Sequence, residues 1–249
     1  MRNIQEALQE HKQIALDVGF SEKQILGVFL YGSQNYGLAT ENSDVDTKVI
    51  IIPTLEDLCS KKAGFVKEYK YNDEKVIVMD LIHYVDNLKK QNINYVEILF
   101  TEHCWVNPDH AWVWDAFIKM RGHIVSYDEN KAIQSMGRQA LHTLKQDSGN
   151  PKKYAMARYL AYFLRTYMDL SQYSNGYEAA LRQPPHVIEE LLALKTGKQN
   201  YTGHDVLALK KELENIVARE FFDDIKYKAK IDKEFMKIII SAVRHLDNL

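Results

Sequence analysis

The sequence predicts an α+β protein, in which a small mixed β-sheet with flanking helices is followed by an all-helical C-terminal domain. Two observations predict this fold class. Short runs of strand-forming residues are confined to the first half of the chain. From about residue 109 onward, apolar residues recur almost wholly with helical spacing. We therefore expect a division into residues 1–125 and residues 126–249.

The first half begins with an amphipathic helix over residues 3–18, whose apolar side chains fall broadly on one side. Four strands are expected after it. The last two flank Asn72-Asp73, a turn pair that predicts a β-hairpin. The expected strands are residues 25–31, 44–52, 65–71 and 75–82.

The second half reads as helices separated by helix-breaking residues. The expected helices are residues 109–120, 129–146, 151–172, 185–196, 203–222 and 232–247. The breakers are Gly149-Asn150-Pro151, Asn175-Gly176 and Pro184-Pro185.

Composition is that of an ordinary globular protein, with 46% hydrophobic and 27% charged residues in 249. The apolar runs are far shorter than the roughly 18 residues of a membrane span. The first residues are polar and helical in pattern, unlike a signal peptide. Two cysteines without a CxxC motif fit a reducing compartment, so we expect a cytoplasmic protein with no membrane partner. The oligomeric state stays open.

The charges are distributed unevenly along the chain. Residues 1–130 hold 13 basic and 20 acidic side chains, whereas residues 131–249 hold 19 and 14. On the helix expected at 151–172, four side chains share one face by spacings of 4, 4 and 3: Tyr154, Arg158, Tyr162 and Arg165. Such a face can stack on a base and bind phosphates, or it can be a tyrosine-rich core edge with snorkelling arginines.

The segment Leu30–Val49 carries the most informative motif. Gly32 and Gly37 have the glycine spacing of a Walker A loop, but Leu38-Ala39 stand where Lys-Ser/Thr is required. This excludes a P-loop NTPase, and no GxGxxG motif indicates a dinucleotide fold.

The residues that remain in this segment suit a triphosphate and its metal. Asp44 and Asp46 lie two apart on an expected strand, so both carboxylates point the same way. Paired carboxylates repel unless a cation lies between them, and hard oxygen ligands suit Mg²⁺. Gly32 lets the backbone approach a phosphate, and Ser33 adds a hydroxyl and an N–H near a helix start.

Gly32-Ser33, Gly37, Ser43 and Asp44-x-Asp46 resemble the signature of the DNA polymerase β-like nucleotidyltransferases. In that superfamily a third carboxylate comes from a later strand that adjoins the first two. The best match is Asp80, the one acid of an apolar strand, where an unpaired carboxylate is costly to bury. Its alternative reading is a surface acid on an edge strand, and Asp86 is the fallback for the third ligand.

A closer resemblance is to bacterial and phage predicted nucleotidyltransferases described as RNA ligase partners. It covers about residues 28–165 and includes the Asn94-x-x-Glu97 segment and the helix Lys153-Tyr-Ala-Met-Ala-Arg158. In these families the helical domain holds the nucleotide from the other side. The resemblance thus implies Lys153 and Arg158 as phosphate or base contacts. Nothing is recognised beyond about residue 175.

These observations predict a two-metal nucleotidyltransferase that moves an NMP from an NTP to an acceptor hydroxyl and releases pyrophosphate. Asp44, Asp46 and Asp80 would hold Mg²⁺, for which Mn²⁺ can substitute, and Asp80 would also be a candidate proton acceptor. An RNA end is one candidate acceptor. Two alternatives stay open: a non-catalytic nucleotide-binding or antitoxin-type partner on the same fold, and a phosphohydrolase that uses the same loop.

Overall fold

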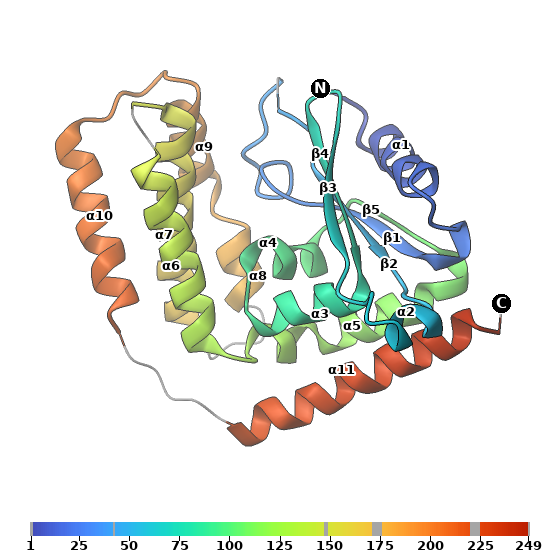
Figure 1. Ribbon diagram of the computed structural model, residues 1–249. Coiled ribbons are helices and arrows are strands. Elements are labelled where there is room, and N and C mark those ends of the chain that lie inside the picture. Colours follow the sequence, from blue (N-terminus) through green and yellow to red (C-terminus); the bar gives the residue numbers. More distant parts are fainter. Residues whose placement is uncertain (1, 42, 147–148, 171–175, 220–224, 249) are drawn as a thin grey trace.

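The computed structural model describes residues 2–41, 43–146, 149–170, 176–219 and 225–248 (Figure 1). A five-stranded mixed sheet, with strand order β3-β4-β2-β1-β5, is the centre of the N-terminal part. Strands β2 and β4 run parallel, and every other neighbouring pair is antiparallel. The strands are β1 (Ile25–Leu30), β2 (Thr47–Ile51), β3 (Val66–Tyr71), β4 (Glu74–Asp80) and β5 (Cys104–Val106).

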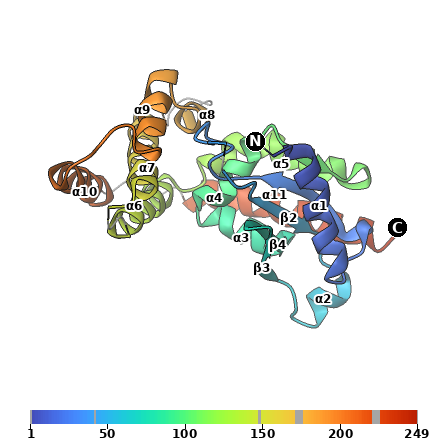
Figure 2. The same ribbon diagram turned by 90° about the horizontal axis from the view of Figure 1, so that it is seen from above.

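Helices cover both faces of the sheet, so its central strands read as nearly continuous apolar runs. Helix α1 (Ile4–Asp17) buries Leu8 and Ala15 against one face. Helices α3 (Leu81–Lys89) and α5 (Ala111–Val125) lie on the other face (Figures 1 and 2). The shorter helical segments of this part are η1 (Glu22–Gln24), α2 (Leu55–Cys59), α4 (Ile93–Val96), η2 (Glu97–Phe100) and η3 (Pro108–His110).

The remaining helices, apart from the last one, extend to one side of the sheet (Figure 2). They are α6 (Glu129–Lys145), α7 (Pro151–Leu170), α8 (Gly176–Leu181), α9 (Pro185–Lys195), α10 (Gly203–Val217) and α11 (Ile225–Leu246). Helix α6 turns Ile133, Met136, Ala140 and Leu144 inward, as the periodicity predicts. Helix α7 is the central member, in contact with α6, α8, α9 and α10.

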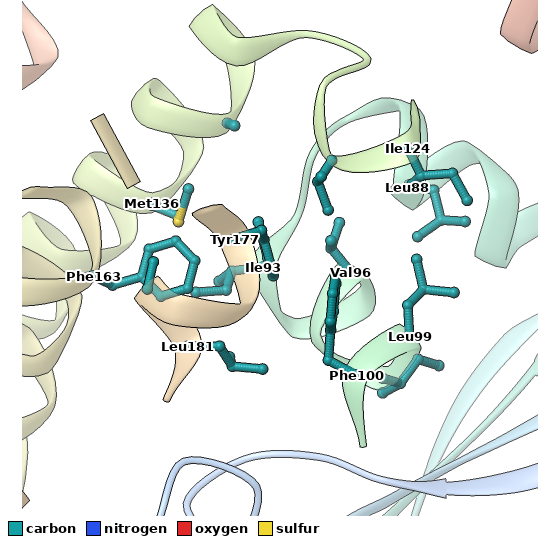
Figure 3. Close-up of a cluster of buried hydrophobic side chains, with 14 of the residues drawn as sticks. Leu88, Ile93, Val96, Leu99, Phe100, Ile124, Met136, Phe163, Tyr177 and Leu181 are labelled. Carbon is teal, nitrogen blue, oxygen red and sulfur yellow. The ribbon is translucent and has the colours of Figure 1, made fainter. Parts of the chain in front are cut away.

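One continuous core joins these helices to the sheet. Leu99 and Phe100 of η2 and Ile93 of α4 belong to the same buried cluster as Phe163 of α7 and Tyr177 of α8 (Figure 3). The Phe100 and Tyr177 rings stack at 5.0 Å. Buried aromatic contacts of this kind fix one element against another, so the helices are held against the end of the sheet where β1 stops.

The fold class predicted from the sequence is confirmed, as are most of its elements. The hairpin turns at Asn72-Asp73, whose φ values of 48° and 69° are those of a tight β-hairpin turn. Some elements differ from expectation, and the fifth strand, β5, was not predicted. Strand β2 begins at Thr47, so Asp44 and Asp46 precede it. Helix α11 packs on α5 and α3 beneath the sheet (Figure 1), although we expected residues 126–249 to form a domain of their own.

No helix among the described residues is both long and apolar enough to cross a membrane.

Candidate active site

The predicted loop and the two aspartates lie together at one end of the central strands of the sheet. Strand β1 ends where β2 begins, because the two are antiparallel and Leu30 pairs with Thr47. Beyond that pair, the Tyr31 N–H donates to the Asp46 carbonyl oxygen at 3.1 Å. The loop that follows Tyr31 therefore begins beside the segment that contains Asp44 and Asp46.

Gly32 lies beside the Asp46 carboxylate. Its φ of +86° lies in the left-handed region that favours glycine. A Cβ on Gly32 would lie 3.9 Å from Oδ2 of Asp46, so the loop faces that oxygen. Within the described part of the chain, neither the N–H nor the hydroxyl of the adjacent Ser33 has a hydrogen-bond partner. Both groups are therefore free to bind an anion beside Asp46.

The two aspartates form a pair of unequal exposure. Asp44 is exposed, whereas Asp46 is half-buried and its Oδ1 accepts the Lys75 N–H at 2.9 Å. Burial is the main cause of a raised Asp46 pKa, and the neighbouring Asp44 charge raises it further, against the lowering effect of the Lys75 N–H. A divalent cation would relieve this repulsion. Two carboxylates beside an anion-binding loop fit Mg²⁺, which binds few protein oxygens and completes its shell with water and phosphate.

The prediction that Asp80 lies beside this pair is wrong. Strand β4 is parallel to β2, and Asp80 is in register with Ile51 at the far end of β2. Five residues along a strand separate Asp46 from that position, or roughly 16 Å. Asp80 instead caps helix α3: one oxygen accepts the His83 N–H, and the other accepts the N–H groups of Gly64 and Phe65.

The fallback residue Asp86 does not take the place of Asp80 either. The fallback Asp86 is exposed on α3, the helix that Asp80 caps at the far end of the sheet. Among the described residues, no group of three or more His, Cys, Asp or Glu side chains could hold a metal ion. The structure thus brings together two of the three predicted ligands.

Ser43 has a structural role in the same loop. Its hydroxyl oxygen accepts the Thr40 N–H at 2.8 Å and so closes the turn before Asp44. The hydroxyl also lies 3.4 Å from the ammonium of Lys195.

Lys195 is a site residue that the sequence analysis did not identify. It lies in the last turn of α9, and its Nζ donates to the Leu38 carbonyl oxygen at 2.5 Å. Burial lowers the pKa of Lys195, and the charge of Lys152 lowers it further, whereas the charge of Asp44 raises it. The Lys195 ammonium therefore interacts electrostatically with both Asp44 and Lys152. A lysine near a helix C-terminus has an ordinary explanation in the helix dipole, so the sequence gives no distinctive signal for it.

The two basic residues implied by resemblance lie elsewhere. Arg158 donates to Glu190 at 2.9 Å and to the Tyr162 hydroxyl at 3.1 Å, and it lines a cavity of about 280 Å³ between α7, α9 and α10. Lys153 donates to Gln146 across the turn between α6 and α7. The structure therefore places Arg158 among ion pairs of the helical region and not against Gly32 or Ser33.

One comparison with known proteins covers the segment that contains the loop and its two carboxylates. Residues 11–108 match the family described as nucleotidyltransferase domain. Among curated proteins, none matches this sequence. A solved structure of a nucleotidyltransferase-like protein from Exiguobacterium sibiricum aligns over 97% of this chain and 75% of its own, with 14% identity and a TM-score of 0.32. Residues 11–108, which include the loop and the two aspartates, are thus similar to a nucleotidyltransferase domain.

Proposed function

We propose that this protein transfers an NMP from an NTP, bound with Mg²⁺, to an acceptor hydroxyl and releases pyrophosphate. One observation carries the proposal: Gly32-Ser33 follows β1 and the pair Asp44 and Asp46 precedes the adjacent strand β2, so they lie at the same end of the sheet. The match to a nucleotidyltransferase domain over these residues supports the same reaction class.

Each residue of the site has a distinct task in this proposal. The Ser33 N–H and hydroxyl bind the triphosphate, and Asp44 with Asp46 holds the metal. When bound, Mg²⁺ supplies charge neutralisation and polarises the phosphoryl oxygens. Lys195 donates to Leu38 and lies near Ser43, so one of its three N–H donors is left for a phosphate oxygen. The acceptor oxygen then forms a bond to the α-phosphorus as the bond to pyrophosphate breaks, and its proton leaves to solvent.

An RNA end is the acceptor that we propose first. Residues 131–249 hold 19 basic and 14 acidic side chains, and Lys195 with Lys152 lies at the side of the loop. Lysine side chains neutralise backbone phosphates without reading sequence. This distribution of charge supports a polyanionic acceptor that approaches from the helical region.

A second candidate is a nucleotide-binding protein that carries out no transfer. The position of Asp80 favours it, because only two carboxylates gather at the loop while the third caps α3. Binding of an NTP with Mg²⁺ needs two carboxylates and the loop, whereas the two-metal scheme needs a third ligand.

One experiment separates these candidates. The protein is incubated with each α-labelled NTP and Mg²⁺ or Mn²⁺, and with cellular RNA, protein or metabolites in turn. Label in the acceptor with stoichiometric pyrophosphate supports transfer, and label in RNA identifies the acceptor. Orthophosphate release indicates the phosphohydrolase reading, and NTP binding without release supports the second candidate.

Variants connect the result to the site. Asp44→Asn and Asp46→Asn should each abolish metal-dependent transfer and leave the fold intact, because each removes a metal ligand outside the core. Asp86→Asn is the matched control, since this exposed aspartate lies on α3 at the far end of the sheet. Transfer at the wild-type rate in Asp44→Asn or Asp46→Asn would contradict the assignment of the metal site.

A further inference from the structure

Glu97 contacts the loop over residues 32–36 with both oxygens of its side-chain carboxylate. It lies on η2 and is 0% exposed. Its Oε2 accepts the Gly32 N–H at 3.1 Å and the Asn35 side-chain amide at 3.3 Å. Its Oε1 accepts the Tyr36 hydroxyl at 2.7 Å. One side chain thus binds three of the five residues between Gly32 and Tyr36.

The first of these contacts decides how the loop faces the site. The Gly32 N–H points toward Glu97, and the position of a Gly32 Cβ faces Asp46. The N–H and hydroxyl of Ser33, which follows, have no hydrogen-bond partner in the part of the chain that the structure describes. The position of Ser33 beside the carboxylates therefore depends on a residue 65 positions later in the chain.

A buried carboxylate needs a compensating charge, and Lys48 supplies it. Lys48 follows Asp46 by two residues on β2, is 0% exposed, and lies over the Tyr31 ring. Its ammonium has no hydrogen-bond partner among the described residues. Burial raises the pKa of Glu97 to about 7, while the Lys48 charge and the three donors act to lower it.

The helical region holds the same loop from the other side. The Tyr36 ring stacks on Tyr159 of α7 at 4.7 Å, and a Cβ on Gly37 would lie 3.9 Å from Ile188 of α9. Glu97 fixes the Tyr36 hydroxyl while Tyr159 fixes its ring. The loop conformation is therefore set by contacts from three separate elements, with Glu97 at their centre.

We propose that Glu97 is a positioning residue, whose carboxylate holds Gly32, Asn35 and Tyr36 in the conformation that presents Ser33 beside Asp46. Lys48 serves as its counter-charge. This inference rests on the proposed function, because the loop is taken as the triphosphate site. It predicts that hydrogen-bond acceptance at position 97, and not charge, is what the loop requires.

Two double variants test this requirement. Lys48→Met with Glu97→Gln removes both buried charges and keeps an acceptor for Gly32 and Asn35, while the new amide donates to the Tyr36 hydroxyl. Lys48→Met with Glu97→Leu removes the same charges and leaves no acceptor. Nucleotide transfer per folded molecule, melting temperature, and hydrogen exchange of the peptide that covers residues 31–38 are measured for both.

The Leu variant should transfer roughly 10- to 100-fold more slowly than the Gln variant, because small displacements of a positioning loop are costly. Exchange over residues 31–38 should be faster in the Leu variant by about the same factor. Equal turnover and equal exchange in two folded variants would overturn the proposal, since a merely structural role changes stability alone.

A single substitution covers the case in which the Leu variant does not fold. Tyr36→Phe removes one of the three hydrogen bonds and no buried charge, so turnover should fall and loop exchange should rise. Tyr177→Phe is the matched control, because the buried Tyr177 hydroxyl has no partner among the described residues. If Tyr36→Phe behaves like Tyr177→Phe, the proposal fails. If the wild-type protein transfers no nucleotide, the proposed function fails, and the exchange data alone decide whether Glu97 fixes the loop.

Discussion

The Lys195 ammonium lies 3.4 Å from the Ser43 hydroxyl, although 152 residues separate the two in the chain. This contact joins the last turn of α9 to the loop that precedes Asp44, so the helical region contributes directly to the edge of the sheet. A cation from one part of the chain thus faces carboxylates from the other. The arrangement suits a ligand that carries negative charge together with a metal ion.

Replacing Lys195 with alanine should weaken binding of NTP with Mg²⁺. A hydrogen bond between a charged donor and a phosphate contributes about 1.5–3 kcal/mol, so the Kd should rise about 10- to 150-fold. Isothermal titration calorimetry measures this directly. Lys198→Ala is the control, because Lys198 is exposed just beyond the same helix. Equal affinities for both variants would show that Lys195 holds the loop without touching the nucleotide.

Asp80→Ala should destabilise the protein and leave the chemistry of the folded fraction unchanged. The substitution removes the cap of α3 and leaves the N–H groups of Gly64 and Phe65 without their acceptor. We expect a loss of about 1–3 kcal/mol in the free energy of unfolding, measured by urea denaturation. Asp86→Ala should change that free energy by less than about 0.5 kcal/mol. A stable Asp80→Ala variant without transfer activity would instead support the prediction that Asp80 is a metal ligand.

Arg158→Ala should lower the melting temperature and leave NTP affinity unchanged. Arg158 is paired with Glu190 inside the helical region and is partly exposed, so the pair contributes about 0.2–1 kcal/mol. Both quantities are measured on one preparation, and Glu190→Ala with the double variant gives the coupling energy. A tenfold rise in Kd at constant stability would instead place Arg158 at the nucleotide.

Stability should decrease as the pH falls from 6.5 to about 4, in part because of His11. This buried residue lies 2.9 Å from the Thr47 hydroxyl and 3.0 Å from the Glu74 carboxylate, which also pairs with Arg2. Burial, and then Arg2, lowers its pKa to about 4, whereas an unfolded histidine has a value near 6.5. Between these values the unfolded chain binds more protons, so its population grows as the pH drops.

The control for this prediction is His11→Gln, which does not titrate. Its free energy of unfolding, measured in urea from pH 4 to pH 7, should fall less steeply below pH 6.5 than that of the wild type. Identical slopes would show that other groups cause the acid sensitivity. The same network also includes the N–H of Val45, the residue between Asp44 and Asp46, which donates to the Glu74 carboxylate.

The sequence by itself determined the features that depend on neighbouring residues. Short runs of strand-forming residues located β1 and β2, and Asn72-Asp73 located the hairpin, because residue propensity and turn chemistry are local properties. The loop at Gly32 and the pair Asp44 and Asp46 were found in the same way, since they lie within 15 residues of one another, between two strands that the structure pairs.

Only the tertiary structure decided which distant groups join that loop. The sequence around an acid at the end of an apolar strand does not show whether that strand pairs in a parallel or an antiparallel way. Because β4 is parallel to β2, Asp80 lies at the opposite end of the sheet from Asp46. Lys195 and Glu97 show the opposite case. A lysine near a helix end has no distinctive spacing, and the resemblance over Asn94-x-x-Glu97 assigned no role to Glu97. The position of each residue at the loop depends on tertiary packing.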